Sequence, residues 1–173
     1  MTYKFPKITA FMIGLAIAMP SVALVAAPAP RVSIASFDQL AQPLPFPYDV
    51  KADPKVQIAA AKARAKAMHK ALLIDLGGNW CGDCRVLAGV MALPEVRGFV
   101  DKNYEVVAVD VGRMDKNLAV PAHYGVGRLE GVPALLIVDP RSDTLLNKGH
   151  IFALADARHM TPQALADWLA SWR

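Results

Sequence analysis

The chain has 173 residues, of which 54% are hydrophobic, and its formal net charge is +4. This length and composition suit one ordinary domain with a substantial apolar core and some additional chain. No segment of about twenty to fifty residues is repeated, which excludes a solenoid.

The first residues are typical of a secretory signal. Lys4 and Lys7 precede an apolar stretch of twelve residues, Ile8–Met19, whereas spanning a membrane takes roughly twenty. The sequence SVA at residues 21–23 places small side chains at the positions that a signal peptidase reads. We therefore expect a signal peptide over residues 1–23, cleavage after Ala23, and a periplasmic or secreted protein. An uncleaved signal would instead tether the protein to a membrane.

The charge of the mature chain is small. Loss of residues 1–23 removes two of the 19 basic residues and none of the 15 acidic ones. Net charge is therefore a weak guide to partners. The one basic run consists of Lys62, Arg64, Lys66, His69 and Lys70. Its helical spacing among alanines, without aromatic residues, is typical of a solvated helix face, so we expect no nucleic-acid partner.

Residues 24–52 contain five prolines among small residues and predict a linker or N-terminal extension, with a short strand near Val32–Phe37. The folded domain is expected over residues 53–173. Asp53 and Pro54 suit the N-cap and first position of a helix that continues to about His69. One face of that helix would carry Val56, Ala60, Ala63 and Ala67.

Short apolar segments at Ala71–Leu76 and Tyr104–Val111 predict buried strands. Between them we expect a helix over Cys81–Met91 and, after Pro94, further helix over Glu95–Lys102. The inward residues of the first helix would be Val86, Leu87 and Val90. After the second strand we expect a weak helix or loop at Lys116–Tyr124. A hairpin should follow, with strands at Val132–Asp139 and Thr144–Lys148 joined by a turn at Pro140–Asp143. We then expect an inserted loop at Gly149–Met160 and a last helix that begins at Thr161 and packs through Leu165, Trp168, Leu169 and Trp172. This order predicts an α/β sandwich with a mixed central sheet and flanking helices.

The chain has two cysteines, Cys81 and Cys84, three positions apart. Outside the cytosol such a pair can form one intramolecular disulfide. Small secreted domains that depend on disulfides for stability usually contain several, so stability is a poor reason for this one. A c-type haem site would need histidine where Arg85 stands. A structural zinc site would need two more ligands, and the four histidines (His69, His123, His150 and His159) are scattered, so we expect no metal.

The predicted strand and helix place Cys81 at a helix N-terminus, where free N–H groups and the helix dipole favour a thiolate. Asp83 opposes this. At about 6 Å and an effective dielectric constant of about 40, its repulsion is roughly 1.4 kcal/mol, about one pKa unit. Helix-end stabilisation is of the same order, and Arg85 adds a small favourable contribution. The two effects nearly cancel, so we expect Cys81 to be less acidic than a strong oxidant needs and the pair to lean toward a reductant.

Three separated features resemble the thioredoxin superfamily. They are the motif WCGDC at residues 80–84, Asp75 in the strand six residues before Cys81, and Val132-Pro133 at the start of a later strand. More narrowly, GGNWCGDCRVL together with VDVGR resembles exported bacterial thioredoxin-family proteins with a W-C-x-D-C motif. The resemblance covers the chain from about Asp53 to its end and implies a thioredoxin-like three-layer sandwich.

The resemblance also implies roles for individual residues. Cys81 would be the exposed nucleophile and Cys84 the buried resolving thiol. Asp75 would be the buried carboxylate that exchanges a proton with Cys84, with a pKa raised by burial; the alternative is a strand-end residue bonded to backbone. Pro133 would be a cis-proline facing the disulfide, and the alternative is a trans-proline at a strand start. Val132 would offer its backbone to a substrate peptide, and Trp80 would line the docking surface or simply pack.

The resemblance implies a thiol–disulfide oxidoreductase of the cell envelope, acting on protein disulfides. Its partners would be protein disulfide or dithiol substrates and an upstream redox partner, and we expect a monomer. No organic cofactor or metal is implied, because the electrons pass through the cysteines. The alternative function is a thioredoxin-fold peptide-binding or chaperone module whose disulfide is purely structural.

Overall fold

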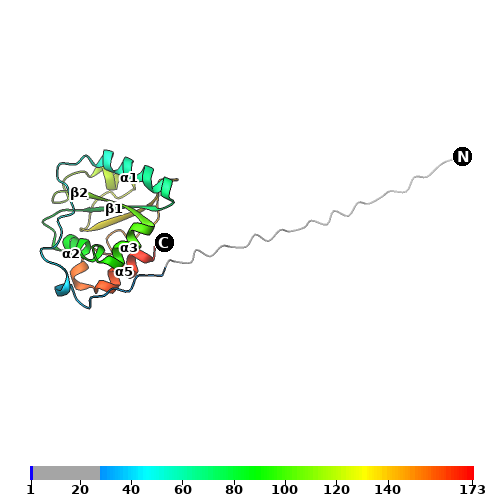
Figure 1. Ribbon diagram of the computed structural model, residues 1–173. Helices are drawn as coiled ribbons and strands as arrows, with labels where there is room; N and C mark the ends of the chain where they lie inside the picture. The colour runs from blue at the N-terminus through cyan, green and yellow to red at the C-terminus, as the bar shows by residue number, and fades with distance from the viewer. Residues whose placement is uncertain (2–27) are drawn as a thin grey trace.

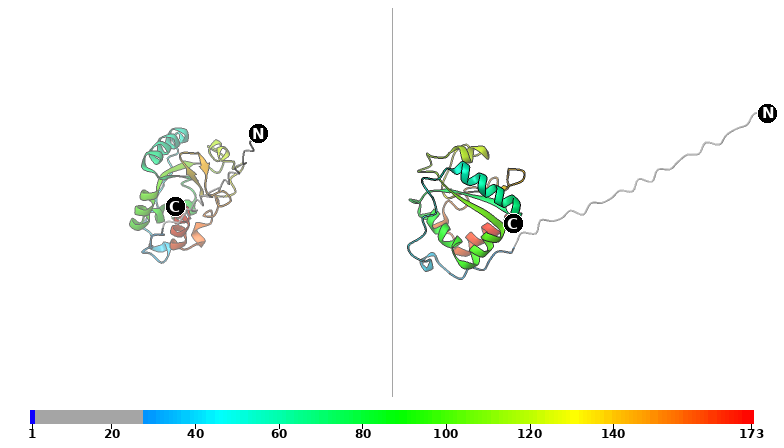
Figure 2. Two further views of the ribbon diagram at one scale, coloured as in Figure 1. Left: turned by 90° about the vertical axis from the view of Figure 1, so that its right-hand side faces the viewer. Right: turned by 45° about the horizontal axis from the view of Figure 1, so that its top comes forward.

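The computed structural model describes Met1 and residues 28–173, so the expected signal peptide and its cleavage site lie outside the described residues. The described chain forms three layers, with a four-stranded sheet between helices (Figure 1). Helix α1 (Pro54–Met68) covers one face of the sheet. The other face is covered by α2 (Gly82–Met91), α3 (Pro94–Asn103) and α5 (Pro162–Ala170), as both views in Figure 2 show. The expected fold class, an α/β sandwich on a mixed sheet, is confirmed.

The sheet has the strand order β2-β1-β3-β4. Strand β1 (Ala71–Gly77) pairs in parallel with β2 (Tyr104–Asp110) and antiparallel with β3 (Ala134–Asp139). Every residue of β1 is buried, because helices cover both faces of the sheet and β2 and β3 flank the strand. The carboxyl end of β1 therefore lies beside the start of β3, with Leu76 opposite Ala134.

Helix α1 begins as expected, but the wrong face was predicted to be buried. The Asp53 side chain accepts a hydrogen bond from the Lys55 N–H at 2.8 Å, and Pro54 is the first helical residue. The buried residues are Ala61 and Ala65, while Val56 is 66% exposed. In an alanine-rich helix more than one face looks equally apolar, so the spacing of small residues does not identify the inner one.

The N-terminal extension packs on the domain, in contrast to the predicted linker. Figure 1 shows it running along the α5 and α2 side before it reaches α1. Leu40 and Tyr48 are buried, and the Arg85 guanidinium of α2 donates hydrogen bonds to the backbone carbonyls of Leu44 and Pro45. Within this described segment there is a 3-10 helix, Phe37–Gln39, and no strand over residues 32–37. The buried side chains of Leu40 and Tyr48 hold the extension on the domain, and the composition of the segment does not identify them.

The C-terminal third follows the predicted order with shorter regular elements. Helix α4 covers only Ala119–His123, and β4 covers only Thr144–Leu145. Where the predicted strand would continue, the side chain of Asn147 forms hydrogen bonds with the backbone of β3. Its amide donates to the Leu135 carbonyl at 2.8 Å, and its oxygen accepts from the Ile137 N–H at 2.9 Å. Within the part of the chain that the structure describes, no helix is both long and apolar enough to cross a membrane.

The predicted loop over residues 149–160 is well packed. Ile151, Leu154 and Ala157 are buried, and the Ile151 carbonyl accepts a hydrogen bond from the Leu135 N–H of β3 at 3.0 Å. A second 3-10 helix, Ala157–His159, lies against α2. This segment is therefore part of the domain surface around the start of α2.

Candidate functional site

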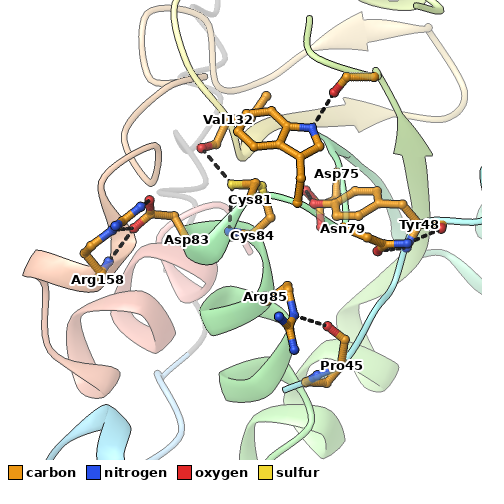
Figure 3. The surroundings of a disulfide bond; sticks show 12 residues. Pro45, Tyr48, Asp75, Asn79, Cys81, Asp83, Cys84, Arg85, Val132 and Arg158 are labelled. Carbon is orange, nitrogen blue, oxygen red and sulfur yellow. Dashed lines mark hydrogen bonds and ion pairs between the residues drawn. A yellow bond between two sulfur atoms is a disulfide. The ribbon is translucent and has the colours of Figure 1, made fainter. Parts of the chain in front are cut away.

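The two cysteines form a disulfide at the N-terminus of α2 (Figure 3). Strand β1 ends at Gly77, three residues form a tight connection, and Cys81 is the N-cap of the helix with extended backbone angles. The backbone N–H of Cys84 donates to the Cys81 sulfur at 3.1 Å. An N-cap side chain receives an N–H of the first turn, so this position stabilises negative charge on the Cys81 sulfur after reduction.

Cys81 is much less exposed than predicted. It is 4% exposed in the disulfide form, and Cys84 is completely buried. The physical reason is the loop before β3, whose Val132 carbonyl oxygen lies 3.4 Å from the Cys81 sulfur. The neighbouring Gly82 is exposed and has no side chain to cover the approach. The expected exposed nucleophile is thus corrected to a cysteine that is almost completely buried in the disulfide form.

The sheet topology brings Val132 and Pro133 to the disulfide. Because β3 runs antiparallel to β1, its first residues lie next to the end of β1, where the connection to Cys81 begins. The Val132–Pro133 peptide bond is cis, and both residues are buried. This arrangement places the loop before β3 directly against one sulfur.

Trp80 lies at the surface beside the pair, 46% exposed. Its indole N–H donates to the Gly112 carbonyl at 2.6 Å, and the guanidinium of Arg113 lies 4.8 Å from the centre of the ring. The indole is therefore held in a fixed position with apolar surface facing solvent. Large fixed aromatic surface of this kind suits contact with a partner.

Asp75 is a buried carboxyl in the middle strand. It is 3% exposed, and its Oδ1 atom accepts a hydrogen bond from the Tyr48 hydroxyl at 2.9 Å. Burial raises the pKa of Asp75 to about 7, although the hydrogen bond from Tyr48 acts in the opposite direction. The partner of this carboxyl is a side chain, in contrast to the backbone-bonded alternative. A carboxyl that titrates near neutrality can accept or donate a proton during turnover.

Asp83 has a partner that the sequence did not indicate. It is 5% exposed, and its two carboxylate oxygens each lie 3.0 Å from the Nε atom of Arg158. The Arg158 backbone N–H also donates to it at 2.8 Å. Burial alone would raise the pKa of Asp83, but the Arg158 hydrogen bonds hold this pKa below its usual value. Arg85, which we expected to offset the charge of Asp83, points instead to the N-terminal extension.

Figure 3 shows these groups on different sides of the disulfide. Asp83 and Arg158 lie on one side, and Asp75 and Tyr48 lie on the other. Across Met1 and residues 28–173, no group of three or more histidine, cysteine, aspartate or glutamate side chains is arranged to hold a metal ion. The chemistry that the described residues can perform centres on the sulfur pair and the carboxyl beside it.

A sequence model of the thioredoxin-like family matches residues 53–140. The chain belongs to the thioredoxin-like family. A solved structure described as a disulphide isomerase from Xylella fastidiosa Temecula1 is 35% identical, with a TM-score of 0.68. That match covers 73% of this chain and 96% of the Xylella chain.

Two further solved structures are more distant. An HIV epitope scaffold is 19% identical with a TM-score of 0.37, and the match covers 67% of this chain and 82% of the scaffold. A Pseudomonas aeruginosa protein of unknown function is 17% identical with a TM-score of 0.39, over 79% of this chain and 96% of the other. No curated protein sequence matches this chain significantly.

The family model and the 35% identical Xylella structure confirm the resemblance to the thioredoxin superfamily. The structure brings Cys81, Cys84 and Val132 together at the start of α2, with Trp80 at the rim. Arg85 points away from Asp83, whose charge we expected it to offset, because it binds the extension.

Two residues of the site were not predicted, Tyr48 and Arg158. Both reach the site from segments that the sequence indicated only as a linker and an inserted loop. An aromatic residue among prolines and an arginine in a loop are the only local signals, and neither identifies a partner. The family and the cysteine pair together support thiol–disulfide oxidoreductase chemistry in general terms.

Proposed function

We propose that the protein reduces disulfides of other proteins in the cell envelope by dithiol–disulfide exchange. The observation that supports this most is the Cys81–Cys84 pair at the N-terminus of α2, next to a buried carboxyl with a pKa of about 7. The predicted signal peptide supports the location, and the protein would act as a monomer on protein substrates supplied with electrons by an upstream redox partner.

In the reduced protein, the Cys81 thiolate attacks one sulfur of a substrate disulfide. That S–S bond breaks, a mixed disulfide forms, and one substrate thiolate leaves. Cys84 then transfers its proton to the Asp75 carboxylate and attacks the Cys81 sulfur, which releases the second substrate thiolate. Two electrons pass from the protein to the substrate, and the Asp75 proton is returned to solvent or to the leaving thiolate.

We infer that the pair reduces its substrates because the environment of Cys84 disfavours a second thiolate. Cys84 is completely buried, and burial disfavours a charged sulfur. An ionised Asp75 adds repulsion at the same side of α2. Because thiols of high pKa form stable disulfides, both features favour oxidation of this pair and reduction of its substrate. Because Arg158 pairs with Asp83, the repulsion between the Asp83 charge and the Cys81 thiolate is weaker than we expected for Asp83 alone. The reduction potential therefore depends on that ion pair as well.

Substrate binding would use the loop before β3 and the surface around it. Val132 has its carbonyl at the sulfur, and an extended substrate segment could pair with the backbone there. Trp80 supplies fixed aromatic surface next to the same sulfur. We infer that these groups orient the substrate disulfide toward Cys81.

A structural disulfide in a binding module is the second candidate, and the 4% exposure of Cys81 favours it. Reduction of insulin by dithiothreitol, followed as precipitation of the free chains, separates the two. We expect the wild-type protein to accelerate precipitation and Cys81→Ser to lose the acceleration. If the two proteins behave alike, the pair is not redox-active toward proteins, and the binding module remains.

The Xylella relative is named a disulphide isomerase, and isomerisation also begins with attack by the first cysteine. Net reduction additionally requires Cys84. A reductase loses turnover in Cys84→Ser, whereas an isomerase retains much of its ability to reactivate scrambled ribonuclease. We expect this variant to be inactive in the insulin assay and poor in the ribonuclease assay.

A further inference from the structure

The N-terminal extension contributes a residue to the redox site. We propose that Tyr48 is a positioning residue that holds the Asp75 carboxyl in place for proton exchange with Cys84. This inference rests on the proposed function, because it concerns the step in which Cys84 loses its proton.

The contacts place the Tyr48 hydroxyl on the Asp75 carboxyl and close to the buried sulfur of Cys84. Tyr48 is 2% exposed and donates to Asp75 Oδ1 at 2.9 Å. A methyl group built at Gly77 would lie 2.8 Å from the Cys84 sulfur and would overlap the Tyr48 ring and hydroxyl. The phenol and the sulfur therefore flank the same backbone position, and only glycine leaves room for both.

Tyr48 is attached to the segment that carries the cysteines. Its N–H donates to the Asn79 side-chain oxygen at 3.1 Å, and the Asn79 amide donates to its carbonyl at 2.8 Å. On the other side of the pair, Arg85 donates to the Leu44 carbonyl at 2.8 Å. Asn79 and Arg85 closely flank the cysteine pair in sequence, so the extension is fixed to both ends of the motif.

A cleft of about 290 Å³ gives Asp75 a route to solvent under the extension. Its lining includes Pro45 and Pro47 of the extension, Ala88 of α2, Ala108 of β2 and Asp75. The small alanine side chains leave space for water next to the carboxyl. The proton that Asp75 receives from Cys84 can leave by this route.

The other ionisable groups that face this region are few. Arg97 of α3 lines the same cleft, the Cys84 sulfur of α2 lies near Tyr48 at Gly77, and the charge of Asp110 at the end of β2 helps to raise the pKa of the Tyr48 phenol. Burial, with Asp75 next to it, raises the pKa of Tyr48 far above its ordinary value, so the phenol stays a donor. A donor that is always protonated favours the ionised form of Asp75, which is the form that accepts the proton of Cys84.

The first test is a titration of Asp75 in the oxidised protein, by carboxyl ¹³C NMR. Loss of the hydroxyl in Tyr48→Phe should raise the midpoint by about one pH unit, since a hydrogen bond to the ionised form is lost. Tyr124→Phe is the matched control, because its hydroxyl also donates to a carboxylate, Asp143, at 3.2 Å but at the far end of β3. An unchanged midpoint in Tyr48→Phe would overturn the proposal.

The second test is the pH profile of the resolving step, measured as release of substrate from a preformed Cys81 mixed disulfide. Tyr48→Phe should move the rising limb of the profile up by about one pH unit, roughly a tenfold lower rate at a fixed pH on that limb. In an Asp75→Asn background the same substitution should leave the profile unchanged. A loss of rate without any shift of the limb would mean that Tyr48 only stabilises the fold, and this contradicts the proposal.

The two proposals fail separately. If wild-type protein does not accelerate insulin reduction, the proposed function is wrong, and the NMR titration still decides whether Tyr48 acts on Asp75. If Tyr48→Phe does not fold, as judged by circular dichroism, Asn79→Ala serves instead, because it releases the Tyr48 backbone and keeps the hydroxyl. That variant should raise the Asp75 midpoint by a smaller amount, and an unchanged midpoint again contradicts the proposal.

Discussion

Asp75 shows how burial of one residue can serve chemistry at a cost in stability. Its ordinary pKa is 3.8 and its pKa in the folded protein is about 7. The folded state therefore binds one more proton than the unfolded state between these two values. The stability that the folded state gains from binding this proton is fully present below about pH 4, and it is lost as the pH rises through 7.

We expect Asp75→Asn to remove this pH dependence. Between about pH 4 and pH 8, the free energy of unfolding of the oxidised wild-type protein should fall relative to the variant by up to about 4 kcal/mol. Urea unfolding without reductant, at several pH values, measures this difference. Parallel curves for the two proteins would show that Asp75 is not buried with a raised pKa.

The sequence identifies residues of the site only where their signal is local. Cys81 and Cys84 lie three positions apart at a predicted strand-to-helix junction, which indicated a redox site, and the resemblance to the thioredoxin superfamily added Asp75, six positions before Cys81. Tyr48 lies 27 positions from its partner Asp75, and Arg158 lies 75 positions from Asp83. Such contacts depend on where the extension and the loop pack, which no local pattern specifies.

At the scale of elements, the 3-10 helix Ala157–His159 completes the N-terminal end of α2. Arg158 lies on Asp83, and its guanidinium is also the group nearest to the position of a side chain at Gly82. The loop that carries it is held by the buried Leu154 and Ala157. The charge next to Cys81 is therefore set by a segment outside the motif.

Removing the positive charge of Arg158 should make the disulfide harder to reduce. In Arg158→Met, Asp83 is an unpaired negative charge that disfavours the Cys81 thiolate, so we expect the reduction potential to fall by about 20–30 mV. Equilibration with glutathione measures this change. Asp83→Asn combined with Arg158→Met should restore the potential. Equal potentials in wild type and Arg158→Met would contradict the coupling.

The extension is an integral element rather than a spacer. Leu40 is buried, and its methyl groups lie close to Gly89 of α2. Leu40→Ala should lower the free energy of unfolding by about 2–4 kcal/mol, as for other buried leucines. Val50→Ala is the control, since Val50 is in the same segment but 63% exposed, and its effect should stay within about 0.5 kcal/mol. Equal, small effects would show that the segment does not pack.

Regular elements were predicted well where capping and apolar runs agree. Asp53 and Thr161 cap their helices as expected, and the runs from Ala71 and Tyr104 are strands. Strand β4 is shorter than predicted, because Asn147 binds the β3 backbone with its side chain. A side chain that replaces strand pairing cannot be recognised before the pairing itself is known.

For the whole molecule, topology explains why the site exists. The antiparallel pairing of β1 and β3 places the loop before β3 beside the end of β1, and α2 begins at that same edge. One sulfur is thus covered by Val132 and the other lies inside the fold, next to the region that the extension closes. The order of elements along the chain predicted the mixed sheet, and the resemblance to the thioredoxin superfamily implied the position of Val132 and Pro133, whereas the closing segments could only be seen in three dimensions.

The most direct measurement of the central claim is capture of a substrate by Cys84→Ser. In this variant Cys81 can attack a disulfide-bonded protein such as insulin, but nothing in the pair resolves the product. Intact-mass spectrometry under non-reducing conditions should show a mixed disulfide at Cys81, which reductant removes and which the wild-type protein does not accumulate. A variant that remains unmodified, with its Cys81 thiol free and the fold intact, would contradict the account.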